Sequence, residues 1–368
     1  MPKVSVIVPC YNVAPYVAKC LDSLVAQTLQ DIEIICVDDK STDDTAKIVA
    51  EYAKRDKRIK LIKQRKNQGV SVARNTAIDA AHGEFIGFMD SDDLLPDPEV
   101  LSDMYNAAIK NKVKICGGSI IRWNPNTGEA KIHSNPVDKF PSNGMVKYSD
   151  WPNDYGFTRF IYDRKWLIKN KILFPTYIRH EDPVFFVHAM CLAGEFYALS
   201  RPTYKYRVSY KSVNWTDQSV HDVFCGLRDC LNIAKKFNMP QLYFNIVKHT
   251  DNFVRRVRSV NEYAVYKIIC DVMEQIAECM PNNFVPARFY LNMLKKHNKK
   301  LYDFYVKDSI RNKRIYLFNL IPIFRIKYAR SGISLYLFES LPLGRCDADN
   351  KSRRYYLFNI IPILKIRG

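Results

Sequence analysis

The chain has 368 residues and a net charge of +18, with 47% hydrophobic and 26% charged residues. This composition excludes global disorder, a collagen-like fibre and a disulfide-rich mini-protein. No run of 18 apolar residues occurs, and the start MPKVSVIVPC lacks the features of a signal peptide. We therefore expect a cytoplasmic protein.

The first third of the chain alternates between short apolar stretches and amphipathic ones. Strands are predicted at 4–9, 32–39, 59–62, 84–90 and 113–118. Helices are predicted between them, including 16–29, 71–81 and 99–111. Repeated β-α-β spacing with nearly continuous apolar strands is typical of a parallel sheet covered on both faces.

The middle of the chain has a different pattern. Two strand-like stretches flank Asn124–Gly128 and predict a hairpin, and 203–208 predicts another strand. Residues 219–300 have a helical pattern with breaks at Pro240 and Pro281. The ten cysteines form no C-x-x-C pair, so we expect reduced, buried thiols and no zinc site.

Polar residues follow three of the predicted strands. They are Pro9-Cys10-Tyr11-Asn12, Asp38-Asp39 and Asp90-Ser91-Asp92-Asp93. Ligands of open parallel sheets bind beyond the carboxyl ends of the strands. The absence of G-x-G-x-x-G and of G-x-x-x-x-G-K-[ST] excludes the usual dinucleotide site and a P-loop.

The acidic segment 90–93 suits a divalent cation. Two carboxylates in D-x-D can share a Mg²⁺ or Mn²⁺ ion and leave places for phosphate oxygens and water. Such an ion would neutralise a departing diphosphate. The alternative is a solvated acidic turn or a helix cap, but Asp38-Asp39 on the same rim favours a metal–diphosphate site.

Four motifs resemble those of a known family. VSVIVPCYN, VDDKSTDDT, NQGVSVARN and FMDSDD, in this order, resemble the nucleotide-sugar half of a family 2 glycosyltransferase with the GT-A fold. The resemblance covers roughly residues 3–118. It implies an α/β, Rossmann-like mixed sheet and inverting sugar transfer from a nucleotide diphosphate donor, usually UDP-linked, with Mn²⁺ or Mg²⁺.

The resemblance also implies roles for individual residues. Pro9, Tyr11 and Asp39 would contact the nucleobase side, with Asp38 close by. Arg74 would reach the nucleotide, Asp90 the ribose, and Asp92, together with Asp90, the metal. The predicted nucleotide-sugar contacts are Pro9, Tyr11, Asn12, Asp38, Asp39, Gly69, Arg74, Asp90, Ser91 and Asp92. One departure is Lys40, where the family more often has glycine.

Inverting transfer needs a carboxylate that takes the proton of the attacking hydroxyl. Asp182 in HEDPVFF resembles the family's base, with Glu181 as the second candidate. Asp182 before Pro183 also fits a helix N-cap, and both roles can hold together. Tyr206-Arg207 and Ser212 resemble a later Y-R…S segment that closes over the diphosphate.

The C-terminal region is basic and repetitive. Residues 295–368 carry 17 Lys/Arg and 5 Asp/Glu, and Tyr-Leu-Phe recurs at Tyr316, Tyr336 and Tyr356, each followed by proline at one offset. Proline in each copy prevents one continuous helix. We expect short segments that attach to an anionic membrane surface, and a packed cap or oligomer contact is the alternative.

Four regions follow from these patterns. Residues 1–118 would form the nucleotide-sugar half, 119–215 the acceptor half, 216–300 a helical region and 301–368 the membrane-associating tail. The expected protein is peripheral on the inner face of the cell membrane and extends a lipopolysaccharide, lipooligosaccharide or capsule on a glycan or lipid-linked glycan acceptor. No nucleic acid partner is expected. A nucleic-acid-binding protein and a sugar nucleotidyltransferase remain as alternatives.

Overall fold

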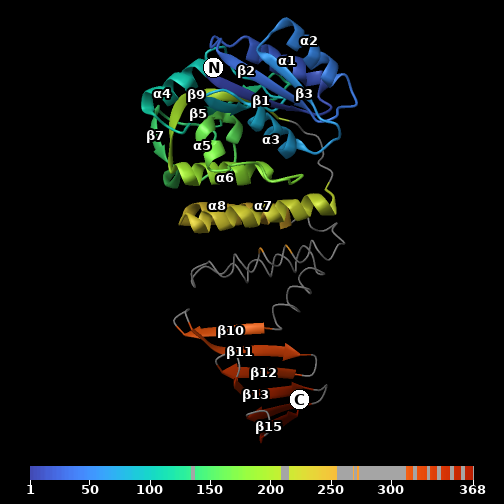
Figure 1. The fold of residues 1–368 in the computed structure, drawn as a ribbon. Coiled ribbons are helices and arrows are strands. Elements are labelled where there is room, and N and C mark those ends of the chain that lie inside the picture. Colours follow the sequence, from blue (N-terminus) through green and yellow to red (C-terminus); the bar gives the residue numbers. More distant parts are fainter. Residues whose placement is uncertain are drawn as a thin grey trace. The chain divides into compact units, whose positions relative to one another are not determined.

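A computed structural model describes residues 1–133, 137–208, 215–254, 268 and 272, and six strands between 312 and 367. The chain divides into two compact units, Met1–Gln275 and Ile276–Gly368. The nine-stranded sheet of the first unit has the order β3-β2-β1-β4-β8-β5-β9-β7, and β6 pairs with β5. Figure 1 labels β1, β2, β3, β5, β7 and β9 of this sheet. The strands are β1 Val4–Cys10, β2 Ile32–Asp38, β3 Ile59–Lys63, β4 Phe85–Phe88, β5 Ile115–Trp123, β6 Ala130–Lys131, β7 Gly144–Lys147, β8 Phe160–Asp163 and β9 Glu195–Arg207.

The sheet is parallel at one end and mixed at the other. Strands β1 to β4 pair in parallel, β8 runs antiparallel to both β4 and β5, and β9 runs parallel to β5. The predicted hairpin is confirmed, since Arg122 in β5 pairs with Lys131 in β6. This is the predicted mixed α/β sheet.

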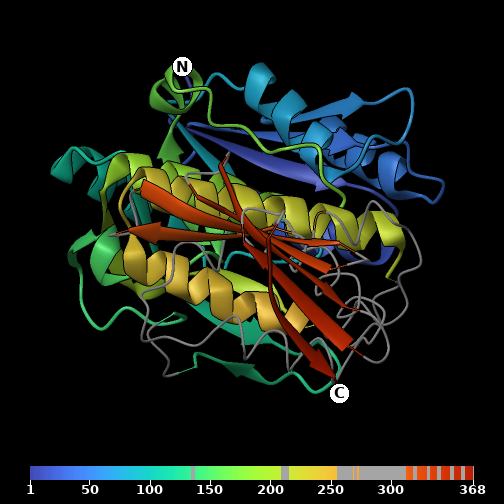
Figure 2. The same ribbon diagram turned by 90° about the horizontal axis from the view of Figure 1, so that it is seen from below.

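Helices join the strands of the first unit. They are α1 Ala14–Val25, α2 Thr45–Arg55, α3 Val70–Ala80, α4 Val100–Asn111, α5 Arg164–Lys169, α6 Glu181–Ala193, α7 Asp217–Lys236 and α8 Pro240–Val254, with short 3₁₀ helices at Tyr148–Asp150 and Phe157–Arg159. Helix α7 packs on both α6 and α8, and α7 and α8 lie side by side (Figures 1 and 2). No helix in the described part of the chain is long and apolar enough to cross a lipid bilayer.

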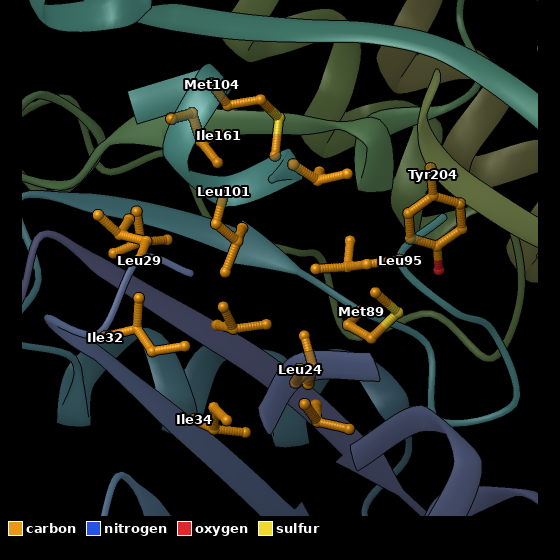
Figure 3. Close-up of a cluster of buried hydrophobic side chains, with 14 of the residues drawn as sticks. Leu24, Leu29, Ile32, Ile34, Met89, Leu95, Leu101, Met104, Ile161 and Tyr204 are labelled. Atoms are coloured by element: carbon orange, nitrogen blue, oxygen red, sulfur yellow. The ribbon is translucent and has the colours of Figure 1, made fainter. Parts of the chain in front are cut away.

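The central strands of the first unit are apolar along their length because side chains pack on both faces of the sheet. Every residue of β1 is buried, as expected for a central strand covered on both faces. On one face, Leu24 of α1 and Leu101 of α4 pack towards Ile34 of β2 and Met89 (Figure 3). On the other, Phe88 contacts Phe157, Phe174 and Phe185. The seven cysteines whose side chains are described are free and buried, as predicted.

The second unit contains a six-stranded antiparallel sheet in chain order. Its strands are β10 Asn312–Leu317, β11 Ile321–Ala329, β12 Gly332–Leu337, β13 Leu341–Ala348, β14 Ser352–Leu357 and β15 Ile361–Arg367. Each 20-residue repeat forms one hairpin, and the register shifts at the same place in each, just before Tyr316, Tyr336 and Tyr356. The short segments expected in the repeat are therefore strands, and the prolines Pro322, Pro342 and Pro362 are each the second residue of a strand.

Candidate functional site

The carboxyl ends of β1, β2 and β4 lie along one rim of a cavity of about 510 Å³. Most of the predicted nucleotide-sugar contacts line it, as do several residues that were not predicted. The lining is Pro9, Cys10, Tyr11, Val13, Asp39, Asn67, Gly69, Val70, Ala73, Arg74, Asp90, Ser91, Asp92, Asp93, Tyr206 and Arg207. We call this space the rim cavity. Residues distant in sequence converge there because parallel strands end at one edge of the sheet.

Asp39 shapes one wall of the rim cavity. Its carboxylate oxygens accept hydrogen bonds from the backbone amides of Gln68, at 2.8 Å, and Gly69, at 2.7 Å. Gly69 has φ 89°, a backbone conformation that favours glycine, and α3 begins at the next residue. Asp39 thus holds the loop before α3 in place as well as lining the cavity.

Asn12 and Asp38 do not line the rim cavity. The Asn12 carboxamide oxygen accepts from the Thr42 amide at 2.8 Å, and the Asp38 carboxylate accepts from the Ser41 amide at 3.3 Å. Both side chains therefore stabilise the loop after β2. In that loop Lys40 has φ 64°, so it occupies the left-handed conformation in which glycine is favoured. Lys40 thus adopts a conformation that is uncommon for residues other than glycine.

The segment after β4 is fixed by contacts from the end of β9. The Tyr204 hydroxyl donates to the Asp93 carboxylate at 2.7 Å and accepts from the Asp90 amide at 3.1 Å. Asp93 also accepts from the Arg207 amide at 2.6 Å. Burial raises the pKa of Asp93 well above its ordinary value. Asp93 therefore anchors the acidic segment, while Asp92 beside it remains 39% exposed.

Asp92 lines the rim cavity beside Asp90. Burial, and then the charge of Asp90, raise the pKa of Asp92 above its ordinary value. A Nη atom of Arg207 lies 3.4 Å from it, and the Arg207 guanidinium stacks 3.9 Å from the Tyr16 ring. No group of three or more His, Cys, Asp or Glu in the described ranges could hold a metal ion. Asp90 and Asp92 could supply two ligands, and the remaining places suit phosphate oxygens and water.

Arg74 connects this segment to the second half of the unit. Its guanidinium donates to Asp90 at 2.8 Å and to Glu181 at 3.0 Å, and its side chain is 5% exposed. It also lies 4.8 Å from the Phe157 ring centre. Arg74 is thus a buried cation between two carboxylates from opposite halves.

A second cavity of about 370 Å³ adjoins the rim cavity. Asp90 and Tyr206 line both, and Asp182 lines only the second. We call it the Asp182 cavity. Its other lining residues are Ile120, Arg122, Val137, Asp138, Tyr155, Gly156, Phe157, Thr158 and Arg159. Burial, and then the neighbouring Glu181 carboxylate, raise the pKa of Asp182 to about 8.

The predicted N-cap role of Asp182 is wrong. Helix α6 begins at Glu181, and its N-cap is His180, with φ 67°. Asp182 lies in the first turn, where the helix dipole favours a carboxylate. Glu181 lines neither cavity, because its side chain is directed to Arg74. Of the two predicted acids, only Asp182 faces open space.

Comparison with known proteins identifies the family. Residues 5–173 match the family described as Glycosyl transferase family 2. An uncharacterized glycosyltransferase of Haemophilus influenzae is 30% identical over 193 residues, which cover 52% of this chain and 72% of that protein. The chain belongs to glycosyl transferase family 2.

Two further comparisons concern sequence and fold. The uncharacterized glycosyltransferase EpsJ of Bacillus subtilis is 35% identical over 221 residues, covering 58% of this chain and 63% of EpsJ. This chain therefore matches less than two thirds of that relative. The structure of S. aureus TarS 1–349 in complex with UDP-GlcNAc has a TM-score of 0.61 at 22% identity, covering 85% of this chain and 94% of that one. The likeness supports the GT-A fold.

The sequence motifs do not indicate every residue of the site. They assign no role to Asp93 or Tyr204, and they connect Arg207 only with closure over the diphosphate. Asp93 is the last residue of the acidic segment Asp90-Ser91-Asp92-Asp93, which was the only sign of a role for it. Its hydrogen-bond partners are more than 110 residues away in the sequence, so the segment alone does not reveal them. Ser212 lies outside the described residues.

Proposed function

We propose that this chain is an inverting glycosyltransferase that moves a sugar from a UDP-sugar to a hydroxyl of a glycan. The observation that carries the proposal is the meeting of the rim cavity and the Asp182 cavity at Asp90. A donor in the first and an acceptor in the second would bring their reacting ends together beside Asp182.

The rim cavity has the chemistry for a nucleoside diphosphate. Tyr11 and Asp39 offer an aromatic ring and a carboxylate to the nucleoside, and Arg207 offers a cation to the diphosphate. The TarS complex with UDP-GlcNAc supports a UDP-linked donor, because that protein shares this fold. We propose a hexosyl or N-acetylhexosaminyl donor.

Asp92, with Asp90, would hold Mn²⁺ or Mg²⁺ beside the diphosphate. The ion would supply positive charge to the departing diphosphate, and its charge would lower the raised pKa of Asp92. The remaining positive charge for the leaving group comes from Arg207.

Asp182 would act as the base. It takes the proton of the acceptor hydroxyl while that oxygen bonds to the anomeric carbon and the bond to the diphosphate oxygen breaks. Attack from the side opposite the leaving group inverts the anomeric configuration. A pKa near 8 makes Asp182 a stronger base than an ordinary carboxylate once it is deprotonated.

For the acceptor, we propose a growing surface glycan, free or lipid-linked, of the lipopolysaccharide, lipooligosaccharide or capsule type. We propose the region boundaries 1–118, 119–215, 216–300 and 301–368, with 301–368 attaching the enzyme to the inner face of the cell membrane. The charge of this region supports the attachment.

A donor screen tests the function. Purified chain with Mn²⁺ is incubated with UDP-Gal, UDP-Glc, UDP-GlcNAc and UDP-GalNAc, and released UDP is measured. We expect release from one donor, and loss of release in Asp92→Asn but not in Asp79→Asn, which removes an exposed carboxylate of α3. Release that is unchanged in Asp92→Asn contradicts the proposal. In a parallel assay with UTP and a sugar 1-phosphate, release of pyrophosphate with formation of a UDP-sugar would indicate a nucleotidyltransferase.

A further inference from the structure

The strand register of the second unit separates basic from apolar residues. Successive residues of a strand belong to opposite faces, and residues directly opposite on paired strands share a face. The register pairs Arg314 with Arg325, Arg325 with Tyr336, and Arg345 with Tyr356. Away from the register shifts before Tyr316, Tyr336 and Tyr356, the same rule extends across all six strands and assigns residues to two faces.

The first group forms what we call the basic face. Its charged members are seven cations and one acid: Arg314, Arg325, Lys327, Arg345, Arg354, Lys365 and Arg367, with Asp347. The second group forms the apolar face. It contains Ile315, Phe324, Ile326, Tyr328, Ile333, Leu335, Leu337, Cys346, Tyr355, Leu357, Leu364 and Ile366, with Gly344, Ala348 and two cations, Lys313 and Arg353.

Like charges stand opposite each other on the basic face. Arg314 pairs with Arg325 in the first hairpin, and Arg354 pairs with Lys365 in the third. Directly opposed like charges destabilise an antiparallel pair in water. The 20-residue repeat places both pairs at the same position of their hairpins. Anions bound between these cations would compensate for the unfavourable pairing.

From this placement we infer that the basic face is a docking surface for the anionic phospholipid headgroups of a bilayer. Six strands about 4.8 Å apart make a face about 24 Å wide. The cations occupy five of its six strands, so they spread over an area instead of following one line. A planar array of headgroups matches that distribution better than a single polyanionic strand. The inference rests on the proposed membrane attachment and assigns it to one face.

The test compares two double variants of the full chain that lose the same charge. Arg325→Gln with Arg345→Gln removes two cations from the basic face, and Lys313→Gln with Arg353→Gln removes two from the apolar face. Co-sedimentation is measured with vesicles of phosphatidylcholine, alone or mixed with phosphatidylglycerol. Folding is checked by circular dichroism, and UDP release from the donor is measured in parallel.

We expect the chain to bind only the vesicles with phosphatidylglycerol. The basic-face double variant should bind about 30-fold more weakly, which corresponds to about 2 kcal/mol at about 1 kcal/mol per cation. The apolar-face double variant should bind at most about threefold more weakly, because its two substituted residues belong to the other face of the sheet. Release of UDP should be unchanged in both.

Equal loss of binding in both variants would overturn the assignment to one face. Stronger binding of single-stranded RNA than of the anionic vesicles would overturn the choice of partner. If the wild-type chain binds no vesicle, the membrane attachment fails as well. Failure of UDP release with intact vesicle binding would refute the sugar transfer and leave this inference standing.

Discussion

Arg74 and Glu181, 107 residues apart in the sequence, form a buried ion pair of 3.0 Å. Arg74 belongs to α3 and lines the rim cavity, and Glu181 is the first residue of α6, next to the proposed base. Because Arg74 also donates to Asp90, one guanidinium fixes the segment after β4 relative to the start of α6. This relationship leads to the first prediction.

Replacing Arg74 by methionine should destabilise the fold strongly. The substitution leaves Asp90 and Glu181 without their buried partner, so we expect a loss of about 3–5 kcal/mol in the free energy of unfolding, measured in urea. Arg65→Met, at an exposed position just before α3, should change it by less than about 0.5 kcal/mol. Equal stability of the two variants would refute the bridging role. A Glu181→Gln double-mutant cycle measures the coupling of the pair directly.

Asp182→Asn should abolish sugar transfer and leave the donor bound. Without a base we expect kcat to fall by about 10²–10⁴-fold, with a nearly unchanged Kd for UDP. Glu181→Gln should retain much more activity, because that side chain is directed away from both cavities. The opposite ranking of the two variants would assign the base to Glu181.

The raised pKa of Asp182 predicts a particular pH dependence. With a pKa of about 8, the carboxyl is protonated at neutral pH, so kcat/KM should rise with pH up to about 8. The folded state holds this proton between the ordinary Asp pKa and 8, where the unfolded state has lost it. This group therefore makes the fold less stable as pH rises through that range. Asp182→Asn should remove this contribution to the pH dependence of stability, measured as the free energy of unfolding in urea. In the unsubstituted chain, a kcat/KM that stays constant from pH 6 to 8 would contradict the raised pKa of Asp182.

Tyr204→Phe should weaken donor binding through the acidic segment. The change removes the hydroxyl that contacts Asp93 and Asp90, so we expect a loss of about 1–3 kcal/mol in stability and a higher KM for the donor. Tyr105→Phe is the matched control, since its hydroxyl donates to Glu84, which lines neither cavity. It should change stability only. An unchanged KM in Tyr204→Phe would mean that the anchor does not position Asp92.

The fold and the rim were predictable because local pattern encodes them. Continuous apolar runs such as 4–9 fix buried parallel strands, and parallel strands bring their ends to one edge. The predicted residues Pro9, Tyr11, Asp39, Asp90, Ser91 and Asp92 line one cavity for this reason. Gly69 and Arg74 line it from the start of α3, and the family resemblance indicated them.

What the sequence did not reveal depends on contacts over long separations. The role of Asp93 depends on Tyr204 and Arg207, and neither spacing nor charge links these segments. The start of α6 was misplaced because the pattern Asp-Pro favours an N-cap, while the chain places His180 there in a left-handed conformation. The faces of the C-terminal repeat became visible only with the strand register.

Calorimetric titration of UDP, with and without Mn²⁺, tests most directly whether the acidic rim binds a cation and a nucleoside diphosphate together. We expect Mn²⁺ to tighten UDP binding by at least about tenfold, equivalent to about 1.4 kcal/mol. We also expect Asp92→Asn to remove this gain and Asp79→Asn to retain it. The same UDP affinity with and without Mn²⁺, or an undiminished gain in Asp92→Asn, would contradict a shared site for the cation and the diphosphate.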